Sequence, residues 1–226
     1  MIRSRCLLSC LSILLLLCLS AFGQTNHFDP SPFISGLFGT CPPEGQGSGD
    51  SDLNRLKNRD LPPPQFSAMT LKTIIETLPQ NLPHKYRRNW TDDEQKAGAE
   101  WESKGVRVIG YLLDAGKQEA ENCNCMSPTQ RDFHLWFSRV PKPAGQLDLS
   151  DSVIVEISPR LLPSHPTWTL ARLRQFADHG TRLRISGWLL WDALHSGNVD
   201  QTRATLWEIH PIHKIEFYQD GSWKEL

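Results

Sequence analysis

Histidines and carboxylates are concentrated in the second half of the chain, and these side chains bind metal ions or transfer protons. The group is Asp132, His134, Glu156, His195, Glu208, His210 and His213. Imidazole and carboxylate are ligands of zinc or manganese, and they also act as general acids and bases on hydrolysable substrates. A structural interpretation stays open beside this one, in which Asp132 and Glu208 form cross-strand ion pairs with arginines such as Arg203.

The strand pattern predicts how the first of these groups are held. Residues 132–138 alternate between polar and apolar, so Asp132, His134 and Trp136 share the face opposite the apolar side chains. Residues two apart on a strand are separated by about 7 Å, which makes Asp132 and His134 neighbours. Glu156 is expected on the same side of the next strand, which covers residues 152–158.

Residues 203–218 are predicted to form two β segments that break at His210-Pro211, because an interior proline removes a ladder hydrogen bond. The turn between them would bring Glu208, His210 and His213 together. The expected ligand-binding residues are Asp132, His134, Trp136, Glu156, Arg203, Glu208 and His210. The expected metal ligands, if an ion binds, are His134, His210 and His213.

Tryptophan is the other residue type that suggests recognition, with eight in the chain. Trp136 lies on the predicted polar face and is the best aromatic platform for a ligand. The other strand tryptophans, Trp188, Trp191 and Trp207, are expected in the core.

The order of elements predicts the fold. A helix is expected over residues 70–78, and a Thr91–Glu94 capping box opens another that ends near residue 104. Strands follow over 105–113, 132–138 and 152–158, then a helix over 167–178 capped by Thr167, and a long strand over 181–192 that bends at Gly187. This β-β-β-α-β-β order, with one extra C-terminal strand, favours a mostly β, α+β fold of the OB-like Greek-key barrel type. A generic antiparallel α+β sheet is the alternative.

The N-terminal sequence indicates export. Residues 1–23 have a basic start, a short apolar core and small residues before a cleavage point, which is typical of a signal peptide. No second apolar run is long enough to span a membrane once this signal is cleaved. We therefore divide the chain into a signal (1–23), a Pro/Gly-rich flexible arm (24–66), a helical flank (67–104) and an OB-like β domain (105–226). The expected location is secreted or periplasmic.

Three cysteines remain after the signal: Cys41, Cys123 and Cys125. In an oxidising compartment, Cys41 is expected to bridge one of the other two and leave one thiol over. A thiolate metal site is the alternative, although Cys-x-Cys is not a zinc-knuckle spacing.

Charge and motifs exclude several functions. The net charge is −1, and it becomes more acidic when Arg3 and Arg5 leave with the signal, so general nucleic-acid binding is not favoured. The sequence has no Gly-rich phosphate loop, no Gly-x-Ser-x-Gly elbow and no His-Glu-x-x-His helix.

Several short runs, taken together, are also informative. They are GYLLDAG at 110–116, ENCNC at 121–125, DFHLWF at 132–137, VEISPR at 155–160, RISGWLLWDALH at 184–195 and RATLWEIHPIHKIE at 203–216. As a set they resemble a domain family of exported bacterial proteins with no assigned activity. The resemblance covers roughly residues 50–226 and implies export and a single compact domain. It assigns no catalytic residue.

The sequence thus supports two functional hypotheses of different classes. The first is an exported binding module that uses no cofactor and holds an oligomeric or protein ligand on a strand face. The alternative is a metal-dependent phosphoester hydrolase that uses the His/carboxylate cluster with a divalent metal such as zinc. A purely structural envelope domain would account for the same residues without a ligand.

Overall fold

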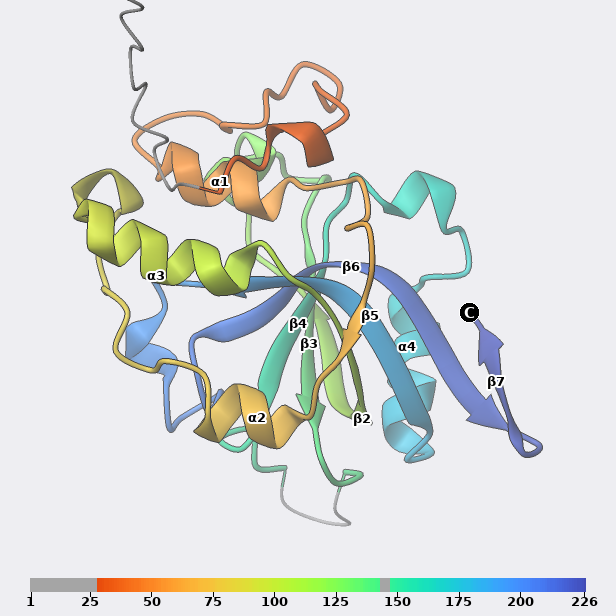
Figure 1. Cartoon of the computed structure of the whole chain (residues 1–226). Coiled ribbons are helices and arrows are strands. Elements are labelled where there is room, and N and C mark those ends of the chain that lie inside the picture. The colour runs from red at the N-terminus through yellow and green to blue at the C-terminus, as the bar shows by residue number, and fades with distance from the viewer. Residues whose placement is uncertain (1–27, 143–146) are drawn as a thin grey trace, which may run out of the picture.

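The computed structural model describes residues 28–142 and 147–226, and a closed five-stranded barrel forms their centre (Figure 1). The barrel strands are β2 (Gly105–Lys117), β3 (Phe133–Ser138), β4 (Val153–Ile157), β5 (Arg182–Trp191) and β6 (Trp207–Gln219). They pair in the order β2-β3-β4-β6-β5, and β5 closes the barrel against β2. Only the β4–β6 pair of these is parallel. This topology confirms the predicted OB-like barrel within an α+β fold.

The barrel interior is built from alternate strand residues. Leu135, Phe137 and Val155 are fully buried, and they pack in one apolar cluster with residues of β2, β5 and β6. Helix α4 (Leu170–Asp178) connects β4 to β5 and buries Leu173 and Phe176 against this cluster. The residues between these positions point to the opposite face of β3, β4 and β6, and that face carries the polar side chains.

Two helices flank the barrel. Helix α2 (Leu71–Glu76) is shorter than predicted, and α3 (Asp92–Glu102) begins with the predicted capping box between Thr91 and Glu94. The predicted N-cap of α4 was wrong: Thr169, not Thr167, accepts the hydrogen bond from the Arg172 amide. Residues 165–168 form a turn instead, in which the Trp168 amide donates to the carbonyl of His165, so the helix starts later.

Strand β6 does not break at His210-Pro211, which corrects the predicted pair of segments. The His210-Pro211 peptide is cis, and the strand continues to Gln219. Ile212 pairs with Gly187 and Ile209 with Leu189, so a bulge accommodates the proline, which has no N–H to donate. A Cβ on Gly187 would lie 2.5 Å from the carbonyl oxygen of Pro211, so this crossing requires glycine. The extra C-terminal strand is β7 (Ser222–Glu225), which pairs with β6.

Residues 28–66, expected as a flexible arm, are packed against the barrel (Figure 1), where Phe28, Leu53 and Leu56 cluster with Leu190 of β5. They include helix α1 (Ser51–Lys57), which buries Leu53 and Leu56, and they end before β1 (Ser67–Ala68), which adds to β2. The expected disulfide forms between Cys41 and Cys125 and leaves Cys123 as the free cysteine of the described residues. The Pro/Gly-rich composition of this segment predicts disorder, because composition alone does not reveal that a disulfide ties the segment to the barrel.

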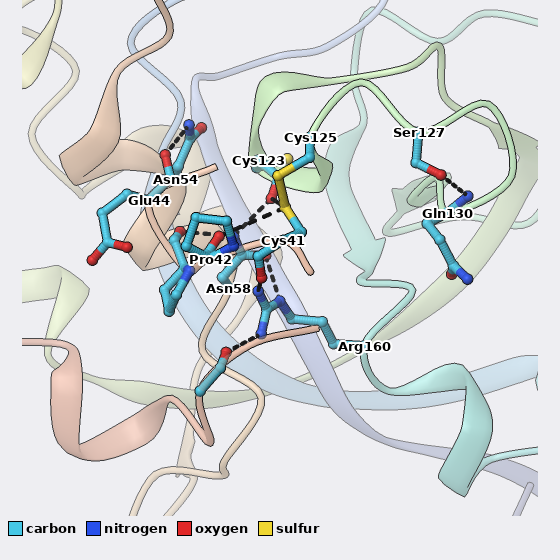
Figure 2. The surroundings of a disulfide bond; sticks show 12 residues. Cys41, Pro42, Glu44, Asn54, Asn58, Cys123, Cys125, Ser127, Gln130 and Arg160 are labelled. Atoms are coloured by element: carbon cyan, nitrogen blue, oxygen red, sulfur yellow. Dashed lines mark hydrogen bonds between the residues drawn. A yellow bond between two sulfur atoms is a disulfide. The ribbon is translucent and has the colours of Figure 1, made fainter. Parts of the chain in front are cut away.

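Side-chain amides and guanidinium groups complete the attachment of this segment (Figure 2). The Asn58 side chain donates to the carbonyl oxygens of Pro43 and Cys123, each at 2.9 Å. Arg160, which follows β4, donates to Asn58 Oδ1 at 3.0 Å and to the carbonyl of Gly36 at 2.8 Å. Carbonyl groups of both parts are therefore satisfied by side-chain donors.

Trp188, Trp191 and Trp207 are buried in the structure, as expected. None of the helices in residues 28–142 and 147–226 has the length and hydropathy required to cross a membrane. The predicted signal, residues 1–23, lies outside the described residues.

Candidate functional site

A pocket of about 270 Å³ lies at one end of the barrel, and we call it the loop pocket. Its walls come from α1, from the β2–β3 connection (residues 118–132) and from the β5–β6 connection (residues 192–206). These two connections correspond to the loops that bind ligands in OB folds. The polar lining residues are Asp50, Asn54, Lys57, Tyr86, Glu121, Asn122, Cys123, Asp192 and His195.

Lys57 is the charged centre of the loop pocket. Helix α1 carries its side chain inward, where Nζ lies 3.5 Å from Glu121 Oε2 and 3.9 Å from Asp192 Oδ2. Burial works to lower the pKa of Lys57, but the charges of Glu121 and Asp192 outweigh it and hold that pKa well above its ordinary value. The pocket therefore contains a permanent ammonium group between two carboxylates.

Asp192 and His195 form a second polar pair at the pocket wall. His195 Nδ1 lies 2.6 Å from Asp192 Oδ2, and about a third of the His195 side chain is exposed. Burial favours a raised pKa for Asp192, but Lys57, His195 and Arg203 hold that pKa below its ordinary value. The bond from Asp192 raises the pKa of His195.

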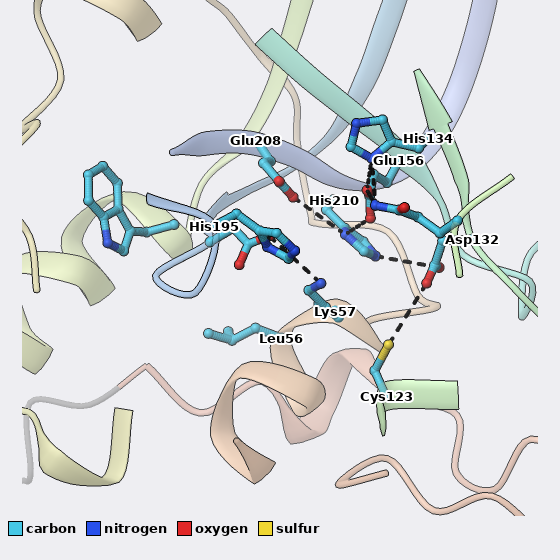
Figure 3. Close-up of polar contacts among 12 residues, drawn as sticks. Leu56, Lys57, Cys123, Asp132, His134, Glu156, His195, Glu208 and His210 are labelled. Atoms are coloured by element: carbon cyan, nitrogen blue, oxygen red, sulfur yellow. Dashed lines mark hydrogen bonds and ion pairs between the residues drawn. The ribbon is translucent and has the colours of Figure 1, made fainter. Parts of the chain in front are cut away.

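A buried polar cluster lies next to the pocket, on β3, β4 and β6 and on the connections that precede β3 and β6 (Figure 3). We use this name for Asp132, His134, Glu156, Arg203, Glu208 and His210. The strand register brings them together, because His134 is directly opposite Glu156 on β4 and Ile154 pairs with Glu208 on β6. Five of the six are at most 2 % exposed, and His134 is 8 % exposed.

Glu156 connects the two histidines of the cluster. His134 Nδ1 lies 2.5 Å from Glu156 Oε1, and His210 Nδ1 lies 2.8 Å from Glu156 Oε2. Gln118 Nε2 donates to Glu156 Oε1 at 3.3 Å. Burial favours a raised pKa for Glu156, but the contacts with His210 and His134 hold its pKa well below the ordinary value.

Asp132 lies between the cluster and the pocket. Its Oδ2 accepts a hydrogen bond from Asn124 Nδ2 at 2.8 Å and a weak one from Cys123 Sγ at 3.8 Å. Its Oδ1 is 3.8 Å from His210 Nε2. Burial raises the pKa of Asp132 to about 8, with His210 opposing the change. Burial lowers the pKa of His210, but Glu156 outweighs it and the net value is about 10.

Several cluster atoms are close to a partner without a well-aligned hydrogen bond. Arg203 Nη1 is 2.7 Å from Glu208 Oε1, yet neither atom makes a hydrogen bond of acceptable geometry. The same is true of His210 Nδ1 and Glu156 Oε2. Buried polar atoms are normally hydrogen-bonded, so this concentration of unsatisfied groups requires an explanation.

The structure brings together six of the seven predicted ligand residues, but it buries them. Trp136, the seventh, is only partly buried. Its ring packs edge-on against His134 at 4.5 Å, and its Nε1 donates to the carbonyl of Thr202. Residues 28–66 and 192–206 cover the face that was expected to be open. His213 lies apart from the cluster, with Nε2 3.0 Å from the carbonyl oxygen of Arg59, and burial lowers its pKa to about 4. The predicted set of three histidine ligands is therefore not assembled.

Lys57, Glu121 and Asp192 are pocket residues that sequence reasoning did not identify. Lys57 and Glu121 lie in segments interpreted as arm and loop. Asp192 could have been identified, because it is the last residue of a predicted strand and the connection that follows carries His195.

Comparison with known proteins does not place the chain in a family. No protein-family model matches the chain, and no curated protein is similar to it.

Proposed function

We propose that this protein is an exported binding domain that holds the end of a hydroxyl-rich oligomer, of the oligosaccharide class, in the loop pocket. The observation that carries the proposal is the position of this pocket between the two connections that OB barrels use for oligosaccharides and oligonucleotides. A volume of about 270 Å³ suits one end unit rather than a threaded chain.

The chemistry of the walls favours hydroxyl groups. Lys57 supplies only donors, whereas the carboxylates of Glu121 and Asp192 supply only acceptors. A hydroxyl both donates and accepts, so one sugar unit can satisfy both kinds of group. Phosphate groups fit less well, because Glu121 and Asp192 would repel them and the chain carries no basic excess.

Export is supported by the covalent structure. The Cys41–Cys125 bridge belongs to the compartments in which disulfides persist, namely the periplasm and the extracellular space.

The test is isothermal titration calorimetry against a panel of cell-envelope oligosaccharides. We expect His195→Ala to weaken binding at least about 10-fold, the equivalent of 1.4 kcal/mol, because it removes a partly exposed group from the pocket wall. His179→Ala, which changes an exposed histidine at the end of α4, is the matched control and should bind normally. Trp136→Ala distinguishes a ligand in the loop pocket from one on the strand face. If this variant loses binding while His195→Ala binds normally, the ligand lies on the strand face instead.

Metal-dependent phosphoester hydrolysis is the second candidate function. It is favoured by the carboxylates and imidazole of the buried polar cluster, which lie next to the loop pocket. The expected result is hydrolysis of a chromogenic phosphodiester that zinc or manganese supports and a chelator abolishes. Lack of turnover with both ions would exclude this candidate.

A further inference from the structure

We propose that Asp132, Glu156 and His210 form a binding site for one divalent transition-metal ion of the zinc class. Each offers one ligand atom, and the three atoms lie within 4.8 Å of one another. The site is separate from the loop pocket, and it stands or falls independently of the oligosaccharide proposal.

The first argument is the way the two carboxylates are held. In each, one oxygen is fixed by neighbours and the other points toward His210 (Figure 3). Glu156 Oε1 is fixed by His134 at 2.5 Å and Gln118 at 3.3 Å, which leaves Oε2 directed at the His210 ring. Asp132 Oδ2 is fixed by Asn124 at 2.8 Å, and Oδ1 faces the same ring. Metal ligands are oriented in this manner by a surrounding layer of hydrogen bonds.

The second argument is that the centre of this arrangement is unsatisfied. Glu156 Oε2 and both ring nitrogens of His210 are buried and make no hydrogen bond of acceptable geometry. His210 and Glu156 are 0 % and 2 % exposed, so bulk water does not satisfy these atoms. An ion between the three residues would bond to Glu156 Oε2 and to one of the two ring nitrogens of His210, and these atoms otherwise have no aligned partner.

The spacing matches the size of such an ion. Zinc binds imidazole nitrogen at about 2.0–2.1 Å and carboxylate oxygen at about 2.0–2.2 Å, so two ligands of a tetrahedral ion lie about 3.4 Å apart. His210 Nε2 and Asp132 Oδ1 are 3.8 Å apart, so a small side-chain shift brings them to that separation. The three ligand atoms, which lie within 4.8 Å of one another, would draw together when an ion binds.

The donor set and the surroundings indicate which ion and how it enters. One imidazole with two carboxylates suits zinc or manganese, whereas calcium and magnesium prefer oxygen donors alone. Asp132 contacts Cys123, which lines the loop pocket, so the pocket gives an ion a route to the site.

The experiment measures metal content of the purified protein by mass spectrometry, then zinc and manganese binding by calorimetry after chelation. We expect one ion per chain and a melting temperature that falls on chelation and recovers with zinc. Asp132→Asn and His210→Gln should each weaken zinc binding at least about 100-fold, because each removes a ligand. His213→Gln is the matched control: it removes a histidine of the same strand that lies outside the group, and it should bind zinc normally.

A measurement on the wild-type protein covers the case in which the variants fail to fold. Nitrogen NMR of labelled histidines should show a zinc-dependent shift at the ring of His210 and none at that of His213. The proposal is overturned if neither millimolar zinc nor millimolar manganese binds the chelated protein. It is equally overturned if zinc binds Asp132→Asn as tightly as it binds the wild type, or if zinc leaves the His210 resonances unmoved.

Discussion

Replacement of Arg203 by methionine should be among the most destabilising single changes in this protein. Arg203 Nη1 lies 2.7 Å from Glu208 Oε1, and the two side chains are 2 % and 0 % exposed. Removing the guanidinium leaves the Glu208 charge buried without its nearest counter-charge. Breaking a buried pair in this way costs about 3–5 kcal/mol of unfolding free energy.

The double variant tests the reasoning more sharply. The Arg203–Glu208 contact is close but poorly aligned, so the attraction within the pair repays the cost of desolvation only in part. Replacing both residues with methionine removes both charges and keeps most of the volume. We therefore expect Arg203→Met/Glu208→Met to recover most of the stability that Arg203→Met loses.

The assay is urea unfolding followed by tryptophan fluorescence, with free energies from linear extrapolation. Arg139→Met is the matched control, because Arg139 pairs with Asp151 at 3.0 Å but the two side chains are 42 % and 55 % exposed. An exposed pair of this kind contributes about 0.2–1 kcal/mol. A loss below about 1 kcal/mol for Arg203→Met, or a double variant less stable than both single variants, would refute the argument from burial.

Three further predictions use the same unfolding assay. Replacing both Cys41 and Cys125 with serine removes a cross-link between residues 84 apart in sequence. The chain-entropy relation predicts a loss of about 4–5 kcal/mol of unfolding free energy. A loss under about 1 kcal/mol would contradict that relation. Gly187→Ala should cost about 1–3 kcal/mol, because its Cβ would lie 2.5 Å from the backbone of strand β6. Gly116→Ala is the control and should be close to neutral, because the nearest atom to its Cβ is 3.8 Å away. Equal losses of stability in the two variants would contradict the argument from close packing. The lowered pKa of Asp192 stabilises the fold above about pH 3.9, and this contribution is lost as the pH falls further. The raised pKa of His195 stabilises the fold below about pH 6.5, and this contribution is lost as the pH rises through the folded value. Asp192→Asn should weaken the pH dependence of the unfolding free energy in both ranges. An unchanged pH dependence would show that the Asp192–His195 pair does not contribute to it.

Local patterns were sufficient to predict the barrel. The alternation of residues 132–138 placed His134 and Asp132 on one face, and the structure keeps that arrangement. Gly187 was expected at a bend, and the register of β5 against β6 shifts there. The break at Pro211 was wrong because a bulge and a cis peptide let a strand continue through proline, and neither can be seen in the propensity of single residues.

The site could be predicted only in part. Residue type and strand face can be read from neighbouring residues, but the burial of these side chains depends on segments far away in the sequence. His134, Glu156 and His210 were named from residue type and strand face, and they do meet. What covers them is residues 28–66, whose attachment depends on contacts between residues far apart in sequence, such as Asn58 with Cys123. Lys57 enters the pocket by the same long-range packing, so no nearby pattern marked it.

The position of the free thiol has a consequence for how the protein matures. Cys123 leaves the ribosome before Cys125, and in the folded protein its carbonyl oxygen lies 3.7 Å from Cys41 Sγ. An oxidant that acts before the turn at residues 122–125 has formed can therefore join Cys41 to the wrong neighbour. That bridge would draw Cys123 away from Asp132 and leave Cys125 reduced, and only thiol exchange would correct it. The thiolate of Cys125 in that species can itself attack Cys41 Sγ and release Cys123, so exchange within the chain restores the native bridge.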